Sequence, residues 1–97
     1  MARATQVFDH RVVRGDLTVQ MVIWQLPAPT RDRPHGLKYR LWCGRAGRTV
    51  VRYDNERGKG DHRHYGEREE VYSFVSGAQL VADSLEDVVR LTGWRVE

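Results

Sequence analysis

Short stretches of alternating apolar and polar residues run through much of the chain. Over residues 37–43 the alternation is strict, which is typical of a strand with one buried side. The polar side of that stretch carries Lys38, Arg40 and Trp42, and Cys43 falls on the apolar side. Further stretches rich in Val, Ile and aromatic residues predict strands over residues 7–13, 18–26, 49–53 and 71–75.

A helical period follows the last predicted strand. Ser76 and Gln79 have the spacing of a capping box, and Gly93 is a residue that commonly ends a helix. Between them, apolar residues recur at intervals of three and four: Ala78, Val81, Ala82, Leu85, Val88 and Val89. The pattern therefore predicts an α+β fold, an antiparallel sheet of four to five strands with one C-terminal helix packed on it.

Composition narrows the class of protein without changing this fold. The chain has 97 residues, which predicts a single domain over residues 1–97. It has no apolar run near the roughly 20 residues of a membrane span, and no secretory signal pattern follows Met1, so we expect a cytoplasmic protein. The single cysteine, Cys43, excludes a disulfide framework and a cysteine-based zinc site within one chain.

Charge is distributed unevenly along the chain. Residues 1–68 contain 14 Lys and Arg against 7 acidic residues, whereas residues 69–97 contain 2 against 6. Most of the basic residues are arginine, whose planar guanidinium group matches phosphate and carboxylate groups. The basic part therefore favours a polyanionic partner such as nucleic acid.

The segment 53–65 concentrates reactive side chains. If residues 62–65 are extended, His62 and His64 point to the same side of the strand. Such a pair suits metal-free RNA cleavage, in which one imidazole takes the 2′-hydroxyl proton and a second acid protonates the leaving oxygen. A lysine or arginine would stabilise the charge on phosphorus. The candidate catalytic residues are Tyr53, Asp54, Arg57, Lys59, His62 and His64.

Basic and aromatic residues around this segment predict an RNA-binding surface. Single-stranded RNA is usually held by basic side chains and by aromatic rings that stack on its bases, a role open to Tyr53 and Tyr65. The candidate RNA-binding residues are Lys38, Arg40, Arg52, Arg63 and Tyr65.

The same residues allow other interpretations. His62 and His64 could bind a metal ion together with Asp54 or Asp61. They could also belong to a solvated polar strand and loop without chemistry, and the chain would then act as a non-catalytic module that binds nucleic acid or protein. We take the metal-free ribonuclease as the working hypothesis, and it requires no cofactor.

The sequence resembles the TumE family of bacterial toxins. The resemblance is carried by the run of residues 52–64 and by the residues after it: Gly66, Glu67, Glu69, Glu70, Tyr72 and Phe74. Residues 21–27, 35–41 and 80–89 also match strings of that family, so the resemblance covers nearly the whole chain.

The resemblance implies the toxin component of a type II toxin–antitoxin system. Its implied partner is an antitoxin with a helix-turn-helix DNA-binding domain. The family is also similar, more distantly, to RelE-like toxins, which cut ribosome-bound messenger RNA. RelE-like toxins generally begin with a helical hairpin, whereas this chain opens with strands, so no site residues are carried over from them. An exposed edge strand could pair two copies of the chain as a homodimer or bind a strand of a partner.

Overall fold

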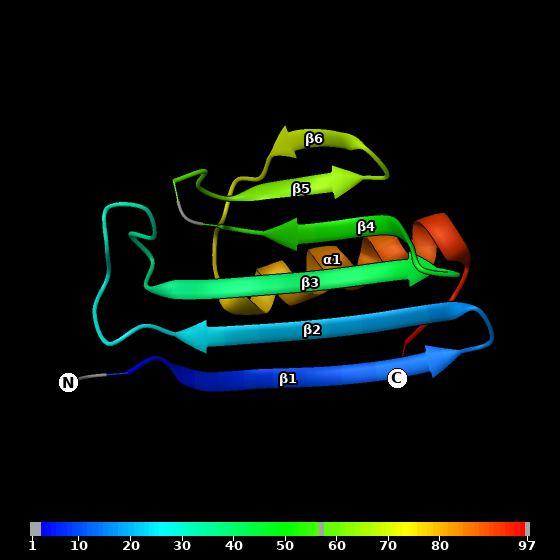
Figure 1. Cartoon of the computed structure of the whole chain (residues 1–97), viewed down its shortest axis with the longest axis horizontal. Coiled ribbons are helices and arrows are strands. Elements are labelled where there is room, and N and C mark those ends of the chain that lie inside the picture. Colours follow the sequence, from blue (N-terminus) through cyan, green and yellow to red (C-terminus); the bar gives the residue numbers. More distant parts are fainter. Residues whose placement is uncertain (1–2, 57, 97) are drawn as a thin grey trace.

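Six antiparallel strands form one sheet in the computed structural model, which describes residues 3–56 and 58–96. They are β1 (Thr5–Arg14), β2 (Leu17–Gln25), β3 (Leu37–Arg45), β4 (Arg48–Asp54), β5 (His62–Tyr65) and β6 (Arg68–Val71). Each strand pairs with its neighbour in the sequence, so the sheet is a simple meander. One helix, α1 (Gly77–Thr92), crosses behind the sheet and covers one of its faces (Figure 1). The predicted α+β class and its C-terminal helix are confirmed.

The core lies between the sheet and α1. Every second residue of β2, β3 and β4 is buried there, as the period of two predicts. The most deeply buried strand residues are Val19, Met21, Leu41, Cys43, Val51 and Tyr53. The helix contributes Leu80 and Val88 to the same core. The buried position of Cys43 confirms the packed thiol, and burial raises the pKa of this thiol above its ordinary value.

The ends of α1 are the ones that the sequence predicts. The Ser76 hydroxyl oxygen accepts a hydrogen bond from the backbone N–H of Gln79 at 3.0 Å. Gly93 ends the helix in the left-handed conformation with φ of 77°, and its N–H donates to the carbonyl of Val89. The helix has 16 residues, and within the described ranges no helix is long and apolar enough to cross a membrane.

The fifth predicted strand, over residues 71–75, is wrong. Val71 ends β6, and the chain from Tyr72 to Val75 has no regular structure as it crosses from the sheet edge to α1. Tyr72 turns into the core, and its hydroxyl donates to the Asp83 carboxylate of α1 at 2.6 Å. The β-forming composition of this stretch therefore serves core packing instead of strand pairing.

The hairpin of β5 and β6 raises the strand count to six, above the four to five that were predicted. Charged residues of low strand propensity dominate both strands, so composition gave no strand signal there. In the observed register Arg63 lies across from the oppositely charged Glu70, and His64 lies across from Glu69. Such cross-strand pairs stabilise a sheet where propensity does not.

A buried polar network fastens the two long loops at one end of the sheet. His35 Nε2 lies 3.0 Å from Asp61 Oδ1, and the Tyr39 hydroxyl donates to the same oxygen at 2.6 Å. His35 Nδ1 accepts from the backbone N–H of Leu37, and its ring stacks on Phe74 with centroids 3.8 Å apart. Both ring nitrogens of His35 have partners, so this residue has a structural role. Its position in the loop before β3 would by itself suggest only a surface or turn residue.

Candidate functional site

The face of the sheet opposite α1 has no helix over it, and we call it the open face. Register and alternation place Lys38, Arg40 and Trp42 of β3 on this face. They are joined by Arg52 and Asp54 of β4, His62 and His64 of β5, and Glu69 of β6. The open face therefore collects most of the charged side chains that the sequence predicts for the site.

His64 lies at the centre of this group. Arg52 Nη2 donates to His64 Nε2 at 3.1 Å, so this ring nitrogen is an acceptor and carries no proton in this arrangement. The same nitrogen lies 3.7 Å from Asp54 Oδ1, and His64 Nδ1 lies 3.8 Å from Glu69 Oε2. The His64 side chain keeps 12% of its surface exposed. The geometry therefore places a hydrogen-bond-accepting ring nitrogen of His64 next to the guanidinium group of Arg52.

His62 has the opposite surroundings. Its Nδ1 lies 3.1 Å from the carbonyl oxygen of Gly60, to which it donates, and its Nε2 lies 3.4 Å from Glu69 Oε1. Both ring nitrogens of His62 thus face oxygen atoms, a carbonyl on one side and a carboxylate on the other. Glu69 contacts both histidines and joins them into one cluster.

Arg52 and Asp54 form an ion pair with spare capacity for hydrogen bonds. Arg52 Nε lies 2.9 Å from Asp54 Oδ2, but its N–H is not aligned with the carboxylate, and this buried nitrogen has no hydrogen-bond partner among the described residues. The Asp54 side chain is only 7% exposed. The Arg52 side chain as a whole is 29% exposed, so the outer part of its guanidinium group can meet an incoming anion.

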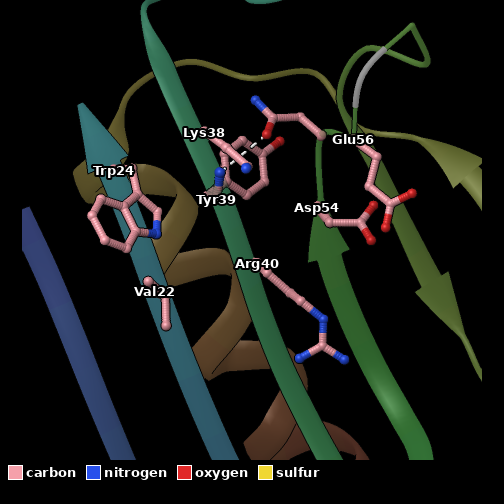
Figure 2. Close-up of a pocket in the computed structure, with 8 residues that line it drawn as sticks. Val22, Trp24, Lys38, Tyr39, Arg40, Asp54 and Glu56 are labelled. Atoms are coloured by element: carbon pink, nitrogen blue, oxygen red, sulfur yellow. Dashed lines mark hydrogen bonds between the residues drawn. The ribbon is translucent and has the colours of Figure 1, made fainter. Parts of the chain in front are cut away.

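A pocket of about 160 Å³ adjoins the cluster and shares Asp54 with it. Figure 2 shows Trp24 and Val22 on β2, Lys38 and Arg40 on β3, and Asp54 and Glu56 at the end of β4, all around the same hollow. The pocket thus combines an aromatic ring with charged groups of both signs, which are the contacts that an unstacked nucleobase and its phosphate use.

The end of β4 is held in place by Asn55, which is 1% exposed. Its side-chain oxygen accepts from the backbone N–H of Tyr39 at 3.0 Å, and its amide donates to the carbonyl of Leu37 at 2.7 Å. Asn55 therefore continues the β3–β4 pairing with its side chain and fixes the positions of Asp54 and Glu56 on either side of it.

Trp42 lies flat against its own strand on the open face. Its ring covers Gly44, where an added Cβ would stand 2.1 Å from a ring carbon. The indole N–H donates to Thr49 Oγ1 at 2.9 Å, and the guanidinium group of Arg40 lies 5.8 Å from the ring centroid. Trp42 is thus a fixed aromatic platform beside the basic residues of β3.

Three predicted residues face the helix side of the sheet instead. Tyr53 is 1% exposed and its hydroxyl donates to Asp87 of α1, so the proposed site no longer includes it. Tyr65 also donates to Asp87, at 2.7 Å, and Arg63 pairs with Glu70. Strand alternation explains these positions, because odd-numbered residues of β4 and β5 point away from the open face.

Of the two candidates in the loop between β4 and β5, the structure describes only Lys59, which makes no side-chain contact with the described residues of the cluster. Lys59 is exposed on the turn between β4 and β5, where its backbone N–H donates to the carbonyl of Glu56. Arg57 lies outside the described residues. The structure therefore brings together Asp54, His62 and His64 of the predicted catalytic residues, and adds Arg52, which the sequence suggests for RNA binding.

Asp87 anchors the sheet to α1 beneath the cluster. Burial raises its pKa, but hydrogen bonds from Tyr53, Arg90 and Tyr65 outweigh burial, and the pKa lies below the ordinary value of 3.8. Burial and the hydrogen bond to Asp87 raise the pKa of the Tyr53 hydroxyl well above its usual range. At neutral pH the Asp87 carboxylate is therefore ionised and the Tyr53 hydroxyl keeps its proton.

The structure adds site residues that sequence reasoning missed. Glu69, Glu56 and Trp24 lie around the cluster and its pocket. Trp24 belongs to a predicted strand, and its place on the polar side of the alternation could have indicated an aromatic residue on the open face. Glu69 gave none, because its contact with the histidines depends on the register of an unpredicted strand.

Metal binding by His62 and His64 with Asp54 or Asp61 is an alternative interpretation of this segment. Among residues 3–56 and 58–96, no group of three or more His, Cys, Asp or Glu residues is placed to hold a metal ion. Arg52 Nη2 donates to His64 Nε2, so a metal ion would have to displace this hydrogen bond.

Comparison with known proteins identifies the family. The searches of curated proteins and of solved structures give no match. The sequence profile of the family described as Toxin TumE matches residues 2–92, nearly the whole chain. The chain therefore belongs to the TumE toxin family, as the toxin component of a toxin–antitoxin system whose partner is a cognate antitoxin.

Proposed function

We propose that the toxin is a metal-independent endoribonuclease whose site is the cluster of Arg52, Asp54, His62, His64 and Glu69 on the open face. The observation that carries the proposal is the unequal hydrogen bonding of the two histidines. His64 offers an acceptor nitrogen next to a guanidinium group, whereas His62 donates from Nδ1 to a carbonyl oxygen and has a carboxylate beside Nε2. Two imidazoles in different environments supply the base and the acid that RNA cleavage needs.

His64 acts as the general base in this proposal. Arg52 Nη2 exchanges its hydrogen bond with His64 for one with a phosphoryl oxygen, and its positive charge stabilises the negative charge that develops there. His64 Nε2 then takes the proton of a ribose 2′-hydroxyl, and the 2′-oxygen attacks the adjacent phosphorus. Asp54 keeps the guanidinium group in position through the 2.9 Å ion pair.

His62 acts as the general acid. It donates a proton to the 5′-oxygen as the bond between phosphorus and that oxygen breaks, which leaves a 2′,3′-cyclic phosphate and a free 5′-hydroxyl. The Glu69 carboxylate lies 3.4 Å from Nε2 of His62 and holds the imidazole in place. The rest of the open face supports RNA binding, with Lys38 and Arg40 for phosphates and the pocket at Trp24 for an unstacked base.

The antitoxin is proposed to inhibit the toxin by covering this face. An acidic segment over Arg40 and Arg52 would neutralise the side chains that bind RNA. Following the family resemblance, we further propose that this antitoxin carries a helix-turn-helix DNA-binding domain, that both proteins are cytoplasmic and that the target is messenger RNA.

The test uses the purified full-length toxin and two substrates. The first is an RNA oligonucleotide, with a second version that carries 2′-deoxyribose throughout. The second is uridine 3′-(p-nitrophenyl phosphate), whose good leaving group needs no acid. We expect the toxin to cleave the RNA oligonucleotide but not its 2′-deoxyribose version. The cleavage should be insensitive to chelator and should leave 2′,3′-cyclic phosphate ends. His64→Ala is expected to lose activity on both substrates, whereas His62→Ala keeps activity on the nitrophenyl ester.

The control is Arg45→Ala, which removes an arginine that pairs with Asp16 in an exposed ion pair far from the cluster. It should cleave as wild type does. A different result would show a toxin that acts by binding alone. In that case the wild type would arrest growth while cellular RNA stays intact, and the His62→Ala, His64→Ala variant would arrest growth equally. Loss of activity with chelator would reject the metal-independent mechanism.

A further inference from the structure

The two edges of the sheet differ in a way that points to a partner at β1. The edge strand β6 has four residues, three of them charged, which is a common protection against unwanted strand pairing. The edge strand β1 has ten residues, and in the part of the chain that the structure describes its backbone pairs with β2 alone. Figure 1 shows its outer edge free along its length.

The side chains of β1 are arranged symmetrically about His10. On one side lie Val7, Phe8 and Asp9, and on the other lie Arg11, Val12 and Val13. When a second β1 is laid antiparallel with His10 opposite His10, Asp9 faces Arg11 and Phe8 faces Val12, and each pair occurs twice. Val7, which lies at the irregularity of β1 between Gln6 and Phe8, comes near Val13. We call this arrangement the His10 register.

We propose that the toxin forms a homodimer through β1 of two copies in the His10 register, which joins the two sheets into one. Asp9 and Arg11 form no ion pair within residues 3–56 and 58–96, so both charges are available to a partner. Opposite charges directly across two strands stabilise their pairing. The strand is therefore complementary to a second copy of itself.

Apolar contacts support the same register. Val7 and Val13 are 51% and 53% exposed, and they would cover each other across the dyad. Phe8 and Val12 pack on the edge of the core and are only partly buried. Facing each other in the dimer, they would extend the core from one copy to the other.

Neighbouring registers are unfavourable, which makes the arrangement specific. A dyad centred on Asp9 would place two carboxylates opposite each other, and a dyad centred on Arg11 would oppose two guanidinium groups. Like charges directly across two strands are destabilising. A shift by one residue is excluded as well, because the paired side chains would then lie on different faces of the sheet.

The geometry of the pairing decides where the two sites lie. The dyad runs perpendicular to the sheet, so both open faces are on the same side of the dimer. Asp9 and Arg11 pair with Val22 and Gln20 of β2 and therefore lie on this side. The dimer would present one continuous basic surface with a histidine cluster toward each end.

Charge reversal tests the proposal in solution. The molar mass of the purified full chain is measured by light scattering and by sedimentation over a range of concentrations at pH 8. We expect a dimer for the wild type. Asp9→Arg alone and Arg11→Asp alone should raise the dissociation constant by about tenfold or more, because each reversal makes two pairs repulsive. The double variant Asp9→Arg, Arg11→Asp should restore the wild-type value.

Mixing the two single variants gives a second, independent readout. In a heterodimer of the two, both positions carry arginine in one copy and aspartate in the other, so each cross-strand pair joins opposite charges. The mixture should therefore dimerise although neither variant does so alone. Glu67→Arg, at the exposed turn between β5 and β6, is the matched control and should leave the dimer unchanged. A monomeric wild type overturns the proposal, as does a dimer indifferent to single reversals.

Discussion

The same strands build both faces of the sheet, but the polar contacts of their side chains differ between the two faces. On the helix side, hydroxyls of Tyr53, Tyr65 and Tyr72 donate to carboxylates of α1 at 2.5–2.7 Å. On the open face, the contacts between histidines and carboxylates are 3.4–3.8 Å long. The first set is closed to further ligands, whereas the second set leaves room for one.

This difference separates groups that hold the fold from groups that are available for chemistry. Short hydrogen bonds to a buried carboxylate fix two elements relative to each other, and losing one leaves a buried polar group unsatisfied. Long contacts and the unaligned Arg52 Nε–H contribute less to the folded state and can be exchanged for contacts with substrate. Substitutions on the two faces should therefore change different properties.

The largest effect is expected for activity on the open face. His64→Ala should lower the rate of RNA cleavage by about 10²–10⁴-fold, the usual contribution of a general base. The free energy of unfolding should fall by only about 1 kcal/mol, because the substitution removes one hydrogen bond, from Arg52 Nη2 at 3.1 Å, and two carboxylate contacts of 3.7–3.8 Å. Gln20→Ala, on the open face of β2, serves as the control. Equal loss of activity in both variants would contradict the assignment.

A large loss of stability is expected on the helix side. Asp87→Ala should lower the free energy of unfolding by about 3 kcal/mol, since it leaves the buried Tyr53 hydroxyl and its neighbour Tyr65 without their acceptor. Denaturant unfolding measures this change. Glu86→Ala, an exposed neighbour on the same helix, should change it by less than about 0.5 kcal/mol. Similar values for the two variants would show that Asp87 does not anchor the helix.

Removing a single hydroxyl from the same anchor should have a smaller effect. Tyr65→Phe keeps the ring but loses the hydrogen bond to Asp87, which should cost about 1 kcal/mol. The rate of RNA cleavage by the folded variant should stay at the wild-type value. A fall in activity without a fall in stability would mean that Tyr65 contacts RNA, and the division between the faces would then be incomplete.

The pH dependence of stability should carry the smallest signal. The pKa of Asp87 is lower in the folded protein than its ordinary value of 3.8, so the unfolded chain takes up the proton first as the pH falls. The contribution of Asp87 is complete above about pH 4 and is lost as the pH falls through the lower folded value. The wild type should therefore lose stability below about pH 4 more steeply than Asp87→Asn does, as thermal unfolding at several pH values would show.

Much of the fold could be predicted because its signals are local. The strict alternation at residues 37–43 and the cap formed by Ser76 and Gln79 each fix an element without help from distant residues. The hairpin of β5 and β6 has no such signal. His62 becomes a strand residue by pairing with Asp54 of β4, and Glu69 by pairing with His64 of β5; pairing is a property of the folded chain.

The sequence predicts how the site residues are arranged only within a single strand. Alternation places His62 and His64 on the same side, and the structure has them there. Their distinct surroundings come from Arg52 across one strand boundary and Glu69 across the other. A shift of register by one residue would turn Tyr53 toward the histidines and Arg52 toward the core. The register of the strands thus decides which residues share the site, and this register cannot be read from the composition.

The meander order of the strands has a consequence for synthesis of the toxin. Each strand can pair with the one made just before it, so the sheet can grow hairpin by hairpin as the chain emerges. The helix that covers the core follows all six strands in the sequence. Until α1 has been made, Val19, Met21 and Leu41 stay exposed to water. We expect interrupted translation products to be recognised by proteases, so that a cell is exposed to the toxin only after the helix has been translated.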